Sequence, residues 1–196
     1  MTFASGLRSI LRQDPDIIAV GEIRDGETAQ IAMRAAITGH LVLSTIHTND
    51  ALATIDRLRD IGVEPYLIAE ALNGVISQRL VRRVCPQCRK AYKPTEEELA
   101  DIGLTPDADC TFYRGTGCPA CFNSGYRGRI AVFEILTMTR KLRSAVSRGA
   151  RREELQEILL QEGGFVSLTE NCRRLVLNGT TTVEEARRIA FSAELP

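Results

Sequence analysis

The sequence of 196 residues lacks several features that mark special classes of protein. It has no tryptophan and only ten aromatic residues (6 Phe and 4 Tyr), so Ile, Leu, Val and Ala must build most of any core. The 25 Lys and Arg balance the 25 Asp and Glu, which argues against general polyanion binding. No run reaches the roughly 18 uncharged apolar residues that span a bilayer, and the first residues lack a signal-peptide pattern. We therefore expect a cytoplasmic protein whose cysteines stay reduced.

The composition is that of a folded globular protein. Hydrophobic residues make up 44% of the chain and charged residues 26%, enough apolar side chains to offset the entropy cost of ordering. The length allows one or two domains.

Residues 1–84 are predicted to alternate strands and helices. Asp16–Gly21 and Leu41–Ile46 are short apolar runs that suit strands buried on both faces. This order predicts a parallel α/β sheet, with its chemistry at the carboxyl ends of the strands. Two strands are few for such a sheet, so we expect the others upstream of Met1 or in another chain. Helical periodicity follows over 25–39, 51–62 and 66–84.

The rest of the chain divides by composition into 85–136 and 137–196. The first part is rich in Cys, Pro and Gly, and the second returns to helical patterns separated by glycines. Thr182 and Glu185 have the spacing of a capping box. Short strands are expected at 111–113 and 129–134, and helices at 95–102, 139–148, 151–162, 168–178 and 182–192.

Four of the six cysteines form two identical Cys-Pro-x-Cys units, Cys85 with Cys88 and Cys118 with Cys121. Each two-residue spacer lets a pair of thiolates bind one ion from a tight turn, so the two units together predict a closed tetrahedral metal site. A closed site is structural, because no position is left for water or substrate. The geometry alone permits zinc or iron.

Two other interpretations of these cysteines are weaker. They could be incidental pairs in a reduced protein, or a nucleic-acid-binding zinc ribbon. Basic residues between Arg79 and Lys93 flank the first unit, but the 29-residue gap between the units exceeds the usual ribbon spacing. Interleaved aromatics are nearly absent. No specific nucleic acid is therefore expected, and Cys110 and Cys172 are interpreted as free thiols.

Polar side chains flank both predicted strands of residues 1–84. An apolar strand that ends in a carboxylate, as at Glu22, is how nucleotide hydrolases hold the group that polarises water or supports Mg²⁺. His40 and His47 bracket the second strand, which places them about 20 Å apart at full extension, so they are not expected to share a metal ion. Each residue alone has an ordinary interpretation as a loop or capping residue, and only their combination favours a functional site. The flanking residues are Glu22, Arg24, Asp25, His40, Thr45 and His47.

Several segments together resemble a known family. The chain is similar to the type II secretion (general secretion pathway protein E) and type IV pilus assembly ATPases, over nearly its whole length. The matching segments are LRSILRQDPDIIAVGEIRDGETAQIAMRAAITGHLVLSTIHTNDA, SQRLVRRVCPQC, CPAC, SGYRGRIAVFEIL and GTTTVEEARRI. The four cysteines point to the secretion or pilus-extension branch rather than to retraction ATPases.

The resemblance implies a fold, cofactors and partners. It implies an α/β chain with part of a RecA-like P-loop NTPase core over 1–84, a zinc subdomain over 85–136 and a helical region over 137–196. It further implies structural Zn²⁺, ATP and Mg²⁺ in the complete protein, a homo-hexamer, and inner-membrane secretion or pilus platform proteins as partners. The location would be cytoplasmic, peripheral at the inner membrane.

The resemblance also implies roles for individual residues. Glu22, at the end of the Walker B strand that starts at Asp16, matches the catalytic carboxylate, and His40 and His47 match the histidine box that senses nucleotide. The residues implied on the nucleotide side are Asp16, Arg24, Asp25 and Thr45, and those implied at zinc are Cys85, Cys88, Cys118 and Cys121.

One large departure limits this interpretation. No Gly-x-x-x-x-Gly-Lys-Ser/Thr phosphate loop occurs, and lysine stands only at positions 90, 93 and 141. We therefore predict that the chain is the C-terminal part of such an ATPase and does not hydrolyse ATP alone. The alternative is a non-catalytic, zinc-bearing interaction module.

Overall fold

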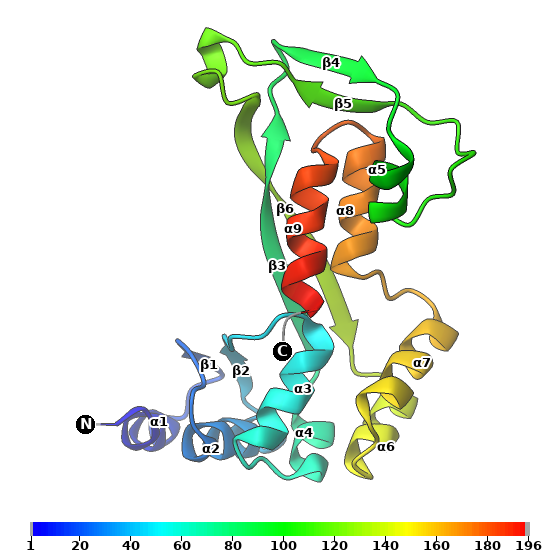
Figure 1. The fold of residues 1–196 in the computed structure, drawn as a ribbon. Helices are drawn as coiled ribbons and strands as arrows, with labels where there is room; N and C mark the ends of the chain where they lie inside the picture. Colours follow the sequence, from blue (N-terminus) through cyan, green and yellow to red (C-terminus); the bar gives the residue numbers. More distant parts are fainter. Residues whose placement is uncertain (1, 195–196) are drawn as a thin grey trace. The chain divides into compact units, whose positions relative to one another are not determined.

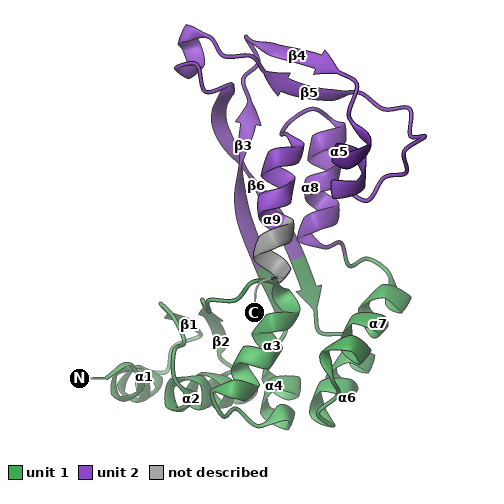
Figure 2. Cartoon of the chain, in the orientation of Figure 1, with its two compact units in different colours: residues 1–76, 135–165 green, residues 77–134, 166–196 purple. Residues whose placement is uncertain are grey.

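The computed structural model describes residues 2–194, with side chains for residues 2–189. The chain folds into two compact units, residues 1–76 with 135–165 and residues 77–134 with 166–196 (Figure 2). Two strands, β3 (Gly74–Val84) and β6 (Tyr126–Thr137), pass from one unit into the other. Each unit is thus built from two separate stretches of the chain. The division into 1–84, 85–136 and 137–196 that was expected from the sequence stays a prediction.

The first unit packs helices against a short parallel sheet. Its core is mostly aliphatic and includes Ile18, Ala29, Ile55, Ile68 and Leu142. Its elements (Figure 1) are α1 (Phe3–Leu11), β1 (Ile17–Val20), α2 (Gly26–Ile37), β2 (Leu41–Ser44), α3 (Ala51–Asp60), α4 (Pro65–Ala71), α6 (Arg140–Ser147) and α7 (Arg152–Glu162).

Aspartates cap two helices of this unit, a few residues after the ends of β1 and β2. Asp25 precedes α2 and accepts a hydrogen bond from the backbone N–H of Thr28, and Asp50 precedes α3 and accepts one from Ala53, each at 2.8 Å. An N-cap carboxylate satisfies one of the free N–H groups of the first turn and favours the positive end of the helix dipole. These caps confirm the two helix starts predicted from the sequence.

β1 and β2 pair in parallel, as predicted, with Ile17 opposite Leu41 and Val20 opposite Ser44. Their burial differs from the expectation of two covered faces. Ile18 and Val20 are buried, whereas Ile17, Leu41 and Leu43 are exposed. Within residues 2–194 the helices cover one face of this two-stranded sheet, so the continuous apolar runs place aliphatic side chains on both faces.

The helix predicted over 66–84 is wrong, because α4 ends at Ala71 and β3 follows. Gly74 interrupts the helical pattern, and a Cβ at this position would lie 2.9 Å from the backbone oxygen of Leu136, on β6. β3 and β6 form a two-stranded sheet, although they lie some fifty residues apart in the sequence. The local apolar spacing allowed either structure, and pairing with this distant strand decided it.

The second unit builds a small core between β3, β6 and helices. Val81, Phe112, Val132, Cys172 and Val176 are buried there. Its remaining elements are β4 (Arg89–Tyr92), α5 (Glu96–Asp101), β5 (Phe112–Gly115), the 3-10 turn η1 (Pro119–Cys121), α8 (Leu168–Leu177) and α9 (Val183–Glu194). β4 and β5 pair antiparallel. Among the described helices, none is both long and apolar enough to cross a membrane.

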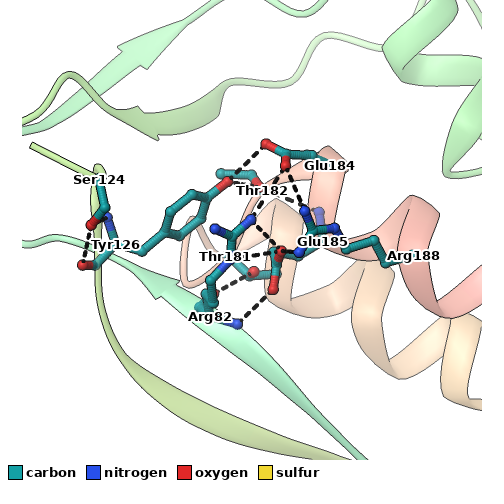
Figure 3. Close-up of polar contacts among 8 residues, drawn as sticks. All are labelled: Arg82, Ser124, Tyr126, Thr181, Thr182, Glu184, Glu185 and Arg188. Carbon is teal, nitrogen blue, oxygen red and sulfur yellow. Dashed lines mark hydrogen bonds and ion pairs between the residues drawn. The ribbon is translucent and has the colours of Figure 1, made fainter.

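An ion-pair network ties the start of α9 to β3 and β6 (Figure 3). The guanidinium of Arg82 lies 4.0 Å above the ring of Tyr126 and donates to Glu185 at 2.9 Å. Glu185 also accepts from the backbone N–H of Arg82 at 2.8 Å. Of the predicted capping box, the bond from the Glu185 backbone to the Thr182 hydroxyl is present, at 3.4 Å. The Glu185 carboxylate instead binds Arg82, which lies far away in the sequence.

Candidate functional site

Parallel pairing brings the carboxyl ends of β1 and β2 to the same edge of the sheet. The two chains stay joined beyond the strands, because Ile23 donates its N–H to the carbonyl of Thr45 at 2.9 Å. The hydroxyl of Thr45 donates to the carbonyl of Gly21 at 2.6 Å. Thr45 therefore holds together the two segments that follow β1 and β2. Glu22 lies between Gly21 and Ile23, the two residues that Thr45 binds.

Glu22 is the centre of a small charged cluster at this edge. Its Oε2 lies 2.7 Å from Nε of Arg24 and 3.5 Å from Nε2 of His47. The hydrogen bond and charge of Arg24, together with His47, hold the pKa of Glu22 below its ordinary value despite some desolvation. The carboxylate is therefore ionised at neutral pH and can accept a hydrogen bond or a proton from a water molecule.

Asp16 and His40 lie at the opposite edge, away from Glu22. Leu41 donates its N–H to the carbonyl of Asp16 at 3.0 Å, which places Asp16 beside the start of β2. The ring Nδ1 of His40 lies 3.0 Å from the carbonyl of Ala35, near the end of α2. The two histidines thus bracket β2 as expected, and the structure groups only His47 with Glu22.

Asp25 has a structural partner within its own helix. Its carboxylate accepts from the backbone N–H of Thr28 at 2.8 Å and from the Thr28 hydroxyl at 3.0 Å. These bonds, the backbone one first, lower the pKa of Asp25. The cap fixes the chain direction directly after Arg24, so Asp25 positions the cluster from outside it.

A polar link that the sequence did not indicate holds the segment after His47. Asp50 caps α3 with one carboxylate oxygen and binds Arg152, at the start of α7, with the other at 2.6 Å. Arg152 also reaches Asp56 at 3.2 Å. An aspartate directly before an apolar helical pattern indicates an N-cap, so the cap at Asp50 could be recognised from the sequence. Its partner Arg152 lies 102 residues away and has no local signal.

The four predicted metal ligands meet in the second unit. The Sγ atoms of Cys85, Cys88, Cys118 and Cys121 all lie within 4.8 Å of one another. The separations are 3.8 Å between Cys85 and Cys118, 3.8 Å between Cys88 and Cys121, and 3.7 Å between Cys118 and Cys121. Four sulfurs at the Zn–S distance of about 2.3 Å in a tetrahedron lie about 3.8 Å apart. The donor set therefore fits a tetrahedral zinc ion.

Backbone contacts bring the two cysteine units together. Cys85 donates its N–H to the carbonyl of Gly125 at 2.9 Å. Gly115 and Gly125 lie so close that a Cβ on Gly115 would be 2.0 Å from the carbonyl oxygen of Gly125, which itself has φ +76°. Only glycine allows this approach and this backbone conformation together. The glycines thus close the loop that carries the second pair of ligands.

Comparison with known proteins places these features in a family. A profile of the family described as type II/IV secretion system protein matches residues 1–188. The type II secretion system protein E of Pseudomonas aeruginosa is 48% identical over 189 residues, which cover 96% of this chain and 37% of the relative. The type IV pilus assembly ATPase PilB of Thermus thermophilus is 50% identical over 188 residues, covering 94% of this chain and 21% of the relative.

The fold has counterparts among solved structures. The pilus retraction motor PilT, solved with bound ADP, superposes with a TM-score of 0.65 at 29% identity and covers 96% of this chain and 43% of that one. The chain thus spans between about a fifth and somewhat over two fifths of the length of these proteins. The likeness confirms the predicted α/β fold and the family resemblance.

Proposed function

Since the chain belongs to the type II/IV secretion system protein family, we propose that it forms the C-terminal part of an ATPase that drives secretion or pilus assembly. The cluster of Glu22, Arg24 and His47 at the carboxyl edge of β1 and β2 carries this proposal. In open α/β sheets, ligands bind at this edge of the strands. An ionised carboxylate beside an imidazole suits a site that orients water toward a phosphoryl group.

Each residue of the cluster has a distinct role in this proposal. Glu22 orients and activates the attacking water, and His47 contacts the nucleotide side, where its position 3.5 Å from Glu22 makes it sensitive to the charge there. Arg24 lowers the pKa of Glu22 through its hydrogen bond and charge. Thr45 holds the two segments in register through its bond to Gly21.

The residues outside the cluster have supporting roles. Asp25 sets the start of α2, and Asp16 and His40 act from the other edge of the sheet, where they would meet a neighbouring subunit of a homo-hexamer. The binding site for ATP and Mg²⁺ would be completed by a phosphate loop, which these 196 residues do not contain. Inner-membrane platform proteins would be the partners, at the cytoplasmic face of that membrane.

The four cysteines would hold a structural zinc ion. The ligand set is closed, so the ion would bind no substrate and would instead order the loops between β3 and β6. Its binding free energy would add directly to the folding free energy of this region. A non-catalytic metal module is the second candidate function, favoured by the closed set of four cysteine sulfurs.

A chimera tests the catalytic proposal. Residues 1–188 replace the matching segment of the Pseudomonas aeruginosa relative, and phosphate release is measured with Mg²⁺ and ATP. We expect Glu22→Gln to lower kcat by about 10²–10⁴-fold, the usual contribution of a general base, with little change in nucleotide binding. Glu27→Gln is the matched control, since Glu27 is an exposed carboxylate that pairs with Arg8.

The outcomes separate the two candidate functions. Hydrolysis by the chimera that is lost in Glu22→Gln and retained in Glu27→Gln supports the ATPase. Full activity of the Glu22→Gln chimera overturns the role of Glu22. Isolated residues 1–196 are expected to release no phosphate, and release that depends on Glu22 would contradict that expectation.

A further inference from the structure

His47 lies in a short segment between β2 and α3 that is fixed at both ends. Before it, the hydroxyl of Thr45 donates to the segment after β1 at 2.6 Å. After it, Asp50 caps α3 and accepts the backbone N–H of Ala53 at 2.8 Å. The His47 side chain is 86% exposed and lies 3.5 Å from Glu22. Its position therefore depends on how the segment is held at each end rather than on packing around the ring.

Thr48 connects the start of α3 to His47. Its hydroxyl donates to the carbonyl of Asp50 at 3.1 Å and lies 3.0 Å from the hydroxyl of Thr54, which is buried on α3. Thr48 directly follows His47 in the chain. A displacement of the first turn of α3 is therefore passed to the backbone at His47.

The first turn of α3 is held in turn by Arg152, the first residue of α7. One nitrogen of its guanidinium lies 2.6 Å from the free carboxylate oxygen of Asp50, and the other lies 3.2 Å from Asp56. A guanidinium that binds two carboxylates fixes their orientation as well as their distance. The helix dipole disfavours a cation at the N-terminal end of a helix. Arg152 is thus poorly placed for α7 itself, and its contacts join α7 to α3 within one unit of the structure.

These contacts form a continuous path from α7 to the cluster around Glu22. We propose that Arg152 is a positioning residue of this cluster, which sets the place of His47 relative to Glu22 by holding Asp50. The catalytic consequence rests on the proposed function, whereas the placement of His47 rests on the contacts alone. A misplacement of about 1 Å near reacting groups lowers a rate by up to about 10²-fold. A lost ion pair on α7 would therefore slow hydrolysis without any contact to the nucleotide.

Proton NMR of the 196-residue chain tests the placement directly. The chain has two histidines, so His47→Gln and His40→Gln assign the two ring C2–H signals. Arg152→Gln removes one charge of the pair, and Asp50→Asn removes the other but retains a good N-cap. We expect both variants to shift the His47 signal in the same direction at neutral pH. The double variant should shift it no further, because both changes remove the same contact.

The direction of the shifts separates position from charge. Arg152→Gln and Asp50→Asn remove opposite charges, so a purely electrostatic effect on the ring would move the His47 signal in opposite directions. The His40 signal is an internal control, because His40 lies at the other edge of the sheet beside the end of α2. It should stay unchanged in each variant.

Two further variants provide matched controls. Asp56→Asn removes the second carboxylate partner of Arg152 but leaves Asp50 bound. Glu154→Gln removes a different ion pair of α7, with Arg148. Both should leave the His47 signal close to its position in the parent. An unchanged signal in Arg152→Gln, opposite shifts in Arg152→Gln and Asp50→Asn, or an equal shift in Glu154→Gln overturns the proposal.

The chimera with the Pseudomonas aeruginosa relative measures the consequence for hydrolysis. Arg152→Gln should lower kcat by about 10–10²-fold and leave the KM for ATP nearly unchanged. Arg152→Lys, which keeps the charge but not the planar fork, should recover part of the loss. In a His47→Gln background, Arg152→Gln should have little further effect, because it acts through His47.

The kinetic outcomes also separate this proposal from the proposed function. A full additional loss of kcat in the His47→Gln background, or an unchanged kcat in Arg152→Gln, overturns the positioning role while the ATPase stands. A parent chimera without activity would count against the proposed function, and the NMR shifts would still decide whether Arg152 places His47.

Discussion

Replacement of Glu185 by glutamine probes the network that joins α9 to β3 (Figure 3). The Glu185 side chain is only 5% exposed and accepts two hydrogen bonds from Arg82, one from the backbone N–H and one from Nε. Glu185→Gln keeps the shape of the side chain but removes its charge and turns an amide N–H₂ group toward a donor. The guanidinium of Arg82 then loses the buried one of its two carboxylate partners and keeps only the exposed Glu184.

The expected cost follows from these contacts. Hydrogen bonds to a charged group contribute about 1.5–3 kcal/mol, and a buried donor without a partner costs about 1–3 kcal/mol. Arg82 remains partly exposed and can recover some hydration, so we expect a loss of about 2 kcal/mol in the free energy of unfolding. Glu184→Gln is the matched control. Glu184 contacts the same Arg82 but is 60% exposed, so about 0–0.5 kcal/mol is expected.

Urea unfolding with equal zinc load measures both variants. Three of the four tyrosines, Tyr92, Tyr113 and Tyr126, lie in the second unit, so their near-ultraviolet circular dichroism reports on it. With a slope of about 2 kcal/mol per molar urea, Glu185→Gln should lower the midpoint by about 1 M. Glu184→Gln should leave the midpoint nearly unchanged.

The pH dependence provides a second test. Burial alone would raise the pKa of Glu185, but the hydrogen bonds and charge of Arg82, with the charge of Arg188, outweigh it and lower this pKa. The stabilisation is therefore fully present above the unfolded carboxyl value of about 4.3 and is lost as pH falls through the lower folded value. The difference between parent and Glu185→Gln should thus shrink in acid. Equal losses in the two variants, or a difference independent of pH, would refute the reasoning.

Three further predictions concern the metal site, the α3 cap and a glycine. Chelation of zinc, or Cys85→Ser, is expected to lower the unfolding free energy by on the order of 10 kcal/mol; a thermal melt of the second unit checks this, with Cys110→Ser as the unchanged control. Asp50→Ala should cost about 2 kcal/mol, from the lost cap and ion pair. Asp56→Ala removes partly exposed pairs with Arg152 and Arg59 but no cap, so it should cost about 0.5 kcal/mol, and similar midpoints in urea would contradict this. Alanine normally stabilises a helix by about 1 kcal/mol relative to glycine. Gly26→Ala should nevertheless destabilise α2, because the added Cβ would lie 2.1 Å from the backbone oxygen of Ile61. An unchanged melting temperature would contradict this prediction.

Local signals in the sequence predicted the parts of the site that form within short stretches. The starts of α2 and α3 were predicted from apolar periodicity, and the caps at Asp25 and Asp50 are consistent with residue type and position, although the sequence analysis did not assign them. The doubled Cys-Pro-x-Cys spacing predicted the thiolate cluster, because each pair is formed by one tight turn. Glu22 and Thr45 were expected at one edge, since parallel strands end on the same side.

Long-range contacts account for what the sequence did not predict. The segment after Ala71 has apolar residues at spacings compatible with a helix, and only pairing with β6 makes it a strand. Arg152 had no signal of its own, because its partners Asp50 and Asp56 lie about one hundred residues earlier. The Glu185 carboxylate was predicted to cap α9, but it binds Arg82, a residue about one hundred positions earlier that local spacing could not indicate.

The sequence by itself thus determined the family, the four cysteines that cluster and the polar residues that follow each strand, because these depend on residue type and short spacing. Only the tertiary structure decided which of them act together. It grouped His47 with Glu22 and placed His40 at the other edge of the sheet. It also joined Asp50 to Arg152, because the packing of α7 against α3 brings together residues that lie 102 positions apart in the chain.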